Sequence, residues 1–193
     1  MNCGVDEVRF TQLDANGEVG QTTTLTTKVK FRRARGAFVV GGPHTPWFNG
    51  RFLARTITTR GFGTSGQVDL FGGRFGNDAA SVTGILVDLP TRRIYYTLEG
   101  RDRLYWRWFN PESQLVGAVR FPMSAGRLPT EHIAGMFASD GWLYFARADD
   151  GGLYRIRFDA GSPGSPGAGV TGRPRLVDDG RRWTTRGLTV LPS

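Results

Sequence analysis

The sequence has few of the side chains that bind metal ions or form cross-links. Its 193 residues include one cysteine, Cys3, and two histidines, His44 and His132. A single cysteine cannot form a disulfide within the chain or build a cysteine-based metal cluster. The two histidines stand in separate Pro-flanked loops, which excludes a histidine-rich metal site. We therefore expect no metal site and no cofactor.

Long apolar segments are also missing. No stretch approaches the ~18 apolar residues that a membrane-spanning helix needs. The first residues, MNCGVDEVRF, lack the basic and then apolar regions of a signal peptide. We expect no membrane span and no signal peptide in this chain. An extracellular localisation follows if the chain is the C-terminal part of a longer exported protein.

Lysine is scarce, although the chain is strongly basic. The formal net charge is +8, and the 25 basic residues are arginines except for Lys28 and Lys30. The arginines are spread over the whole sequence, with one dense run at 28–35. No helix-turn-helix, zinc-finger or RNA-binding signature accompanies the charge. Nucleic acid is therefore not the expected partner.

Glycine, proline and aromatic residues are abundant. The 28 glycines and 10 prolines predict frequent turns and short elements, which favours strands over helices. Hydrophobic residues make up 39% of the chain and aromatic residues 12%, a composition that suits a packed core and not a disordered chain.

Segments of the sequence recur with a period of about fifty residues. An alternating segment with an apolar last residue occurs four times, ending at Phe10, Ile57, Phe109 and Phe158. A glycine that opens a short apolar segment also occurs four times, at Gly36, Gly84, Gly135 and Gly187. Two independent features with one common period predict a repeat architecture.

One period contains a glycine-led apolar strand, an aromatic strand, a long alternating strand and a fourth strand, joined by turns rich in Gly and Asp. In LYWRWF, residues 104–109, both faces of the strand carry bulky apolar groups, as expected for a sheet packed between two others. Such a four-stranded antiparallel meander is typical of a β-propeller blade. We predict an all-β fold, a propeller-like array of blades in one domain over 1–193. A β-sandwich is the alternative.

The predicted blades cover residues 36–71, 84–121 and 135–177. Residues 5–31 and 187–193 would form a partial blade, either closing a small four-bladed ring or belonging to an incomplete ring. We favour the incomplete ring, as the C-terminal part of a longer chain, because no segment supplies the aromatic strand of the partial blade.

Two segments carry a family resemblance: IYYTLEGRDRLYWRWFNPESQLVGAVRF at 94–121 and WLYFARADDGGLYRIRF at 142–158. They resemble the C-terminal propeller-like modules of exported actinobacterial proteins, in which such blades follow carbohydrate-active or PKD-type domains. The likeness covers most of the chain after Gly36 and is weaker before it. It implies the fold, an extracellular setting and other domains of a longer chain as partners, but not a reaction.

Three motifs are candidates for chemistry, and each has a simpler structural interpretation. GFGTSG at 61–66 fits the dinucleotide pattern, but it occupies the position of a hairpin loop in the repeat. LDANGE at 13–18 has the alternating oxygens of a calcium loop, but Leu25 stands where a further acid is needed. His44 or His132 could serve as a general base, yet no G-x-S-x-G nucleophile motif is present. We predict no catalytic residue.

Aromatic and arginine side chains remain as candidates for ligand binding. Most aromatic residues are expected to fill the space between blades, whereas Trp47 and Trp183 lie in connecting segments. With Asn49 and Arg182 beside them, they are the predicted ligand-binding residues, because aromatic faces stack on sugar rings and polar neighbours bind hydroxyls. We predict a non-catalytic binding or scaffolding module whose partner is a glycan or cell-surface polysaccharide. The alternatives are a propeller-based hydrolase or lyase, and a purely structural spacer.

Overall fold

The structure is a computed structural model. It describes residues 6–14, 16–27, 34–40, 53–58, 61–63, 78, 81–113, 115–183 and 188. Within these ranges the regular structure is almost entirely β, with a short 3₁₀ helix at Thr130–His132. The paired strands are antiparallel. The predicted all-β class is confirmed.

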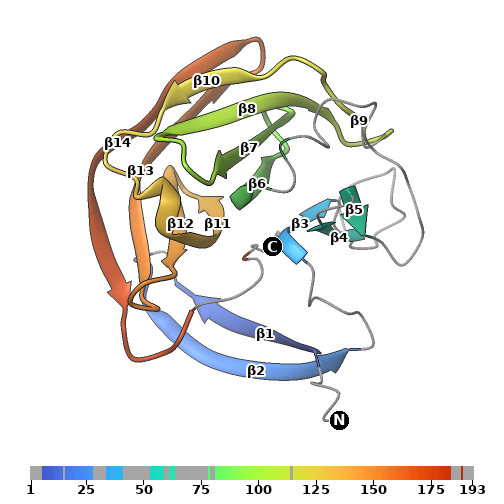
Figure 1. Cartoon of the computed structure of the whole chain (residues 1–193). Helices are drawn as coiled ribbons and strands as arrows, with labels where there is room; N and C mark the ends of the chain where they lie inside the picture. Colours follow the sequence, from blue (N-terminus) through green and yellow to red (C-terminus); the bar gives the residue numbers. More distant parts are fainter. Residues whose placement is uncertain are drawn as a thin grey trace.

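Two smaller sheets come first along the chain (Figure 1). The β1–β2 sheet contains β1 (Asp6–Leu13) and β2 (Val19–Thr27). The β3–β5 sheet contains β3 (Ala34–Val40), β4 (Leu53–Thr58) and β5 (Gly61–Gly63).

Two larger sheets follow. The β6–β10 sheet has the order β10-β8-β7-β6, with β9 paired to β8. Its strands are β6 (Val82–Asp88), β7 (Arg93–Leu98), β8 (Arg103–Asn110), β9 (Leu115–Val116) and β10 (Phe121–Ser124). The β11–β14 sheet keeps the chain order. Its strands are β11 (Ile133–Ser139), β12 (Trp142–Arg147), β13 (Leu153–Ser162) and β14 (Ser165–Asp178).

The sheets follow one another around a common centre (Figure 1). The leading strands β3, β6 and β11 lie nearest to this centre, and β10 and β14 lie at the outside. Strand β6 contacts both β3 and β11. A Cβ atom on Gly84 of β6 would lie 2.6 Å from Ile133 Cγ2 and 3.1 Å from Met136 Sδ. This glycine therefore allows two leading strands to pack closely.

Each leading strand carries an irregularity at its glycine. The register with the second strand shifts between Ala34 and Gly36 in β3, and between Val82 and Gly84 in β6. In β11 the shift begins at Ile133 and includes Gly135, whose φ is 136°. The glycine of the sequence repeat thus coincides with a β-bulge in three sheets. The propeller itself stays a prediction.

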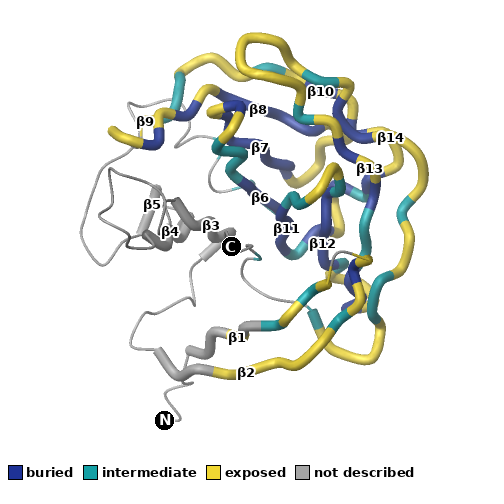
Figure 2. The backbone as a smooth tube through the Cα atoms, turned by 180° about the vertical axis from the view of Figure 1, so that it is seen from behind, coloured by how far each residue is buried: buried dark blue, intermediate teal, exposed yellow. Residues whose placement is uncertain are grey.

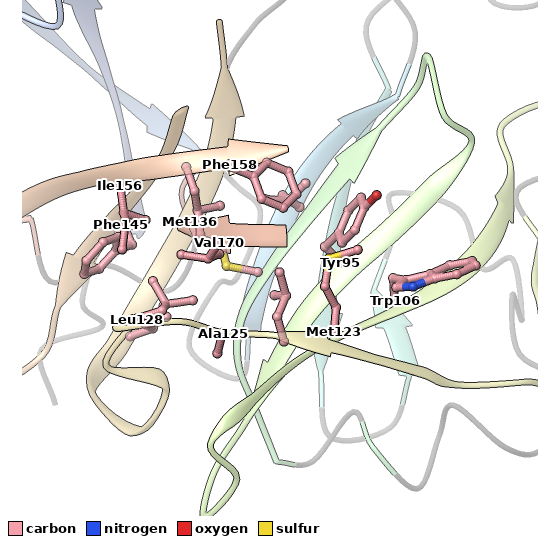
Figure 3. Close-up of a cluster of buried hydrophobic side chains, with 14 residues drawn as sticks. Tyr95, Trp106, Met123, Ala125, Leu128, Met136, Phe145, Ile156, Phe158 and Val170 are labelled. Atoms are coloured by element: carbon pink, nitrogen blue, oxygen red, sulfur yellow. The ribbon is translucent and has the colours of Figure 1, made fainter. Parts of the chain in front are cut away.

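Apolar side chains cover both faces of the β6–β10 sheet, and its strand β7 is buried along its whole length (Figure 2). Tyr95 and Tyr96, neighbours in β7, are both fully buried and belong to different clusters. The Tyr96 cluster includes Tyr105 and Phe109 of β8. The Tyr95 cluster fills the space toward the β11–β14 sheet, as Figure 3 shows. Alternate residues of a strand therefore reach two different cores.

A third cluster lies on the other face of the β11–β14 sheet. It contains Phe137, Tyr144 and Leu153, with Leu13 and Leu188 packed against it. Leu13, near the start of the described chain, and Leu188, at its end, thus pack against the same apolar cluster. Each of the two larger sheets therefore has an apolar cluster on each of its two faces.

The larger sheets span 82–124 and 133–178, where the sequence predicts blades at 84–121 and 135–177. The outer strand of the first differs from the expected position: it is Phe121–Ser124, and residues 117–120 are irregular. The buried guanidinium of Arg107 explains this, because its Nη1 donates to the carbonyl oxygens of Gly117 and Ala118. Those carbonyls therefore bind a side chain instead of a neighbouring strand.

Two glycine-rich segments contain paired strands. The segment DAGSPGSPG, 159–167, is a hairpin in which β13 and β14 continue to a turn at Pro163 and Gly164. Its glycines permit this, since a side chain on Gly161 would overlap the backbone of Gly167. The first three residues of GFGTSG form β5, paired with β4, and 64–66 lie outside the described residues.

Candidate functional site

A pocket of about 510 Å³ opens between the β6–β10 and β11–β14 sheets. Three segments line it: 87–90 between β6 and β7, 138–141 between β11 and β12, and 158–160 in β13. Its volume falls within the ~300–1,000 Å³ range that is usual for small-molecule sites. The two turns occupy equivalent positions in the two sheets, each following a leading strand.

Asp88 closes the first of these turns. Its Oδ2 accepts hydrogen bonds from the backbone N–H of Thr91, at 3.1 Å, and from the Thr91 hydroxyl. Arg92 follows with a φ of 53° and donates its N–H to Leu89 O. An aspartate that binds the backbone three residues ahead is a common turn former. The same hydrogen bonds hold the Asp88 carboxyl at the edge of the pocket.

Asp140 and Gly141 form the second turn. Their φ angles are 51° and 73°, the left-handed values that a tight hairpin turn needs and that Asp and Gly tolerate. The hydroxyl of Ser139 donates to Asp140 Oδ2 at 2.9 Å. This is one of the Gly- and Asp-rich turns that the repeat predicts, and it brings a second carboxylate to the pocket.

Asp159 of β13 supplies the third carboxylate. It accepts the backbone N–H groups of Ala168, at 2.9 Å, and Gly161, at 2.8 Å. These two donors stabilise the charged form and hold the pKa of Asp159 below its ordinary value. The carboxylate is therefore an anion, and a hydrogen-bond acceptor, throughout the neutral range.

The β13 wall of the pocket is fixed by a buried arginine. Arg93 of β7 is fully buried, and its guanidinium donates to Ala160 O at 2.7 Å and to Ser162 O at 3.1 Å. The hydroxyl of Tyr95 donates to the same Ala160 oxygen at 3.0 Å. Burial raises the pKa of Tyr95, so this hydroxyl keeps its proton. Two side chains of one sheet thus hold a pocket residue of the next.

The pocket combines anionic acceptors with apolar walls. Asp88, Asp140 and Asp159 come from three different segments, and apolar side chains such as Val87 and Phe158 line the surface between them. Within the described part of the chain, Oδ1 of Asp88 and Oδ1 of Asp140 accept no hydrogen bond. The arrangement can bind a ligand that donates several hydrogen bonds and has apolar faces.

Of the predicted ligand-binding residues, the two that the structure describes, Arg182 and Trp183, do not line this pocket. Trp47 and Asn49 lie outside the described residues. Arg182 is exposed. Trp183 is half-buried, packs against the third apolar cluster and donates its indole N–H to Asp178 Oδ2 at 2.6 Å. Its contacts are those of an anchor for the segment after β14.

The other sequence motifs have structural contacts where they are described. Asp14 Oδ1 accepts the backbone N–H of Glu18 at 2.7 Å, and Asp14 O accepts that of Gly17 at 2.9 Å, so LDANGE contains a hairpin turn. His132 is exposed at the end of the 3₁₀ helix, and His44 lies outside the described residues. The described ranges contain no group of three His, Cys, Asp or Glu side chains placed to hold a metal ion.

In the described part of the chain no helix has the length and apolar character needed to cross a membrane. Comparison of the sequence with protein-family models and with curated proteins gives no match. The pocket and its three carboxylates are therefore the features from which a function is inferred.

Proposed function

We propose that the chain is a non-catalytic binding module of propeller-like architecture and that the pocket between its two larger sheets binds a carbohydrate. The observation that carries this proposal is the meeting of three aspartates from separate segments on apolar walls. A sugar offers the complementary surface, because its hydroxyls donate hydrogen bonds and its ring carbons present apolar C–H faces.

The arrangement of sheets supports a propeller over a sandwich. In a sandwich two sheets bury one face each, whereas the β6–β10 sheet here is covered on both faces. The leading strands β3, β6 and β11 lie side by side at the centre, and each carries its bulge at the repeated glycine. Repeated sheets that bury their faces against neighbours are the principle of a propeller.

The state of the carboxylates supports a neutral, hydroxyl-rich ligand. Asp159 is held as an anion by backbone donors, so it can only accept hydrogen bonds from a ligand. Asp88 and Asp140 each engage one oxygen within their own turn and have the other available. Acceptors that are already fixed in position bind a sugar with little loss of conformational freedom.

A glycoside hydrolase is the second candidate, and one observation favours it. Asp88 ends the leading strand β6 and Asp140 follows the leading strand β11, so two acids reach one pocket from equivalent positions. A glycosidase needs a general acid whose pKa is raised. The third acid, Asp159, has a lowered pKa. Asp159 is therefore poorly suited to be that general acid.

The test is a glycan array probed with the wild-type chain and with Asp140→Asn. Asparagine tolerates the left-handed backbone of position 140, so the substitution removes the charge and leaves the turn. We expect the wild type to bind a defined set of glycans and Asp140→Asn to bind them at least about tenfold more weakly, as loss of a charged acceptor predicts. Asp102→Asn, an exposed acid that does not line the pocket, is the control.

The outcomes separate the candidates. Absence of binding to every neutral glycan, or equal binding of neutral glycans by wild type and Asp140→Asn, would overturn the proposed function. Release of new reducing ends from a bound glycan, lost in Asp140→Asn, would establish the hydrolase instead.

A further inference from the structure

An unbalanced positive charge lies on the face of the β11–β14 sheet opposite to the Ile156 and Phe158 core. Trp142 of β12 is paired directly with Arg157 of β13, whose guanidinium carbon lies 3.9 Å from the indole centroid. Arg155, two residues earlier, places its guanidinium carbon 4.7 Å from the same centroid. Two guanidinium groups therefore make cation–π contacts with the same indole ring.

A third arginine joins them from β14. Arg175 is the direct cross-strand partner of Arg155, and directly paired residues lie on the same face of a sheet. Like charges in such a pair repel each other. We call Trp142, Arg155, Arg157 and Arg175 the basic face. Arg157 and Arg175 are exposed, and Trp142 and Arg155 are half-buried.

No acid neutralises the basic face within the described residues. Arg155 donates to a backbone oxygen, that of Asn16, at 2.5 Å, and none of the three arginines pairs with a carboxylate of the described chain. Arginines elsewhere do have such partners: Arg107 pairs with Asp78. Arg147 pairs with Asp149 and Asp150. The basic face is distinguished by the number of such arginines that lie together: three, on two neighbouring strands, none with a carboxylate partner among the described residues.

We propose that the basic face binds an acidic polysaccharide, one that bears carboxylate or sulfate groups. A guanidinium matches either anion with two parallel hydrogen bonds. Guanidinium groups on two neighbouring strands present successive binding positions for a charged polymer. The net charge of +8 adds attraction at longer range. This site is distinct from the aspartate pocket, whose charge has the opposite sign.

The aromatic geometry favours a polysaccharide over a nucleic acid. Proteins that bind single strands use uncovered aromatic rings on which bases stack. The ring of Trp142 is half-buried and already contacts two guanidinium groups. The basic face therefore offers charge recognition without a free stacking platform.

The test compares two variants with the same loss of charge. In the first, Arg157→Gln and Arg175→Gln neutralise the exposed part of the basic face. In the second, Arg103→Gln and Arg127→Gln neutralise two exposed arginines outside it. Binding to immobilised polygalacturonate and heparin is measured by biosensor at low and moderate salt, with dextran as the neutral polymer and DNA, single-stranded and duplex, as the competing polyanion. Thermal unfolding checks that both variants are folded.

We expect the wild type to bind at least one acidic polymer, with affinity falling as salt rises, and not to bind dextran through this face. The basic-face variant should lose about tenfold or more in affinity, and the control variant about twofold or less. Asp140→Asn should retain acidic-polymer binding, which separates this site from the pocket.

Three results would overturn the inference. The first is absence of binding to both acidic polymers. The second is equal loss in the two arginine variants, which would mean that net charge alone acts. The third is tighter binding to DNA that depends on Arg157 and Arg175, which would assign the face to nucleic acid. None of these results changes the outcome of the glycan array with the pocket variant.

Discussion

Arg93 and Trp108 are direct cross-strand partners on β7 and β8, and the guanidinium carbon of Arg93 lies 5.1 Å from the indole centroid of Trp108. A second indole, that of Trp106, lies 4.7 Å from the same guanidinium carbon. One buried cation thus contacts two aromatic rings. This cation–π geometry partly offsets the cost of burying an arginine.

The β11–β14 sheet contains the same arrangement with the residue types exchanged. Trp142 stands at the position of Arg93, and Arg157 stands at the position of Trp108 in the pairing. One indole there contacts two guanidinium groups. The repeat therefore maintains an Arg–Trp contact, while the exchange of types replaces one buried cation with one half-buried and one exposed cation.

Substitution of Arg93 should lower the free energy of unfolding much more than substitution of Arg157. Arg93→Met keeps an unbranched side chain but removes the donor to Ser162 O and one of the two donors to Ala160 O. We expect it to lower the free energy of unfolding by about 1–3 kcal/mol. Arg157→Met, at an exposed position, should change it by about 0.5 kcal/mol or less. Urea unfolding of both variants measures the contrast, and equal effects would contradict the role given to Arg93.

The contact between leading strands is tested at Gly84. Gly84→Ala places a Cβ atom within 2.6 Å of Ile133 Cγ2, and overpacking of this kind should cost about 1–3 kcal/mol. Ile133→Ala removes the opposing atoms, so the double variant should be more stable than the sum of the two single effects predicts. The measurement is a double-mutant cycle by denaturant unfolding. Strict additivity would mean that β6 and β11 do not meet at this point.

The sequence predicts the larger features of this fold because they follow from local patterns. The alternation in LYWRWF separates Tyr105 and Phe109 from Leu104 and Trp106, and the structure places these pairs in different cores. The repeated glycines coincide with bulges. The outer strand at 121–124 was missed because its position depends on Arg107, a side chain that binds backbone oxygens ten residues away.

The sequence patterns could not predict the pocket, and the reason is physical. Asp88 and Asp140 each lie in a local turn. Their meeting with Asp159 depends on how two sheets pack, which no local pattern records. Trp183, a predicted ligand-binding residue in a connecting segment, donates its indole N–H to Asp178. Equivalent turns in two adjacent repeats were the signal that could have indicated the site.

A buried ion pair supports the opposite face of the β6–β10 sheet. Asp78 Oδ2 accepts from Arg107 Nη2 at 2.8 Å and from the Tyr96 hydroxyl at 2.9 Å, and burial raises the pKa of Tyr96. Asp78→Asn removes a carboxylate that pairs with the buried guanidinium of Arg107, so we expect a loss of about 3 kcal/mol in unfolding free energy.

The control for Asp78→Asn is a substitution of Arg120, which forms a second ion pair with Asp78. Arg120 contacts Asp78 Oδ1 at 2.8 Å, but its side chain is 40% exposed. Arg120→Gln should therefore cost about 1 kcal/mol or less. A cost at Asp78 no larger than that at Arg120 would show that this network contributes little.

The pocket carboxylate Asp159 should give stability a defined pH dependence. Its pKa is lower in the folded chain than in the unfolded one because Ala168 and Gly161 donate backbone hydrogen bonds to the anion. Its contribution is therefore fully present above the unfolded value of about 3.9, and it declines as the pH falls through the folded value. We expect Asp159→Asn to be less stable than the wild type at pH 7, with the difference shrinking below about pH 4. Urea unfolding of both proteins across this range measures it, and a difference that grows toward acid pH would show that the two backbone donors do not stabilise the anion.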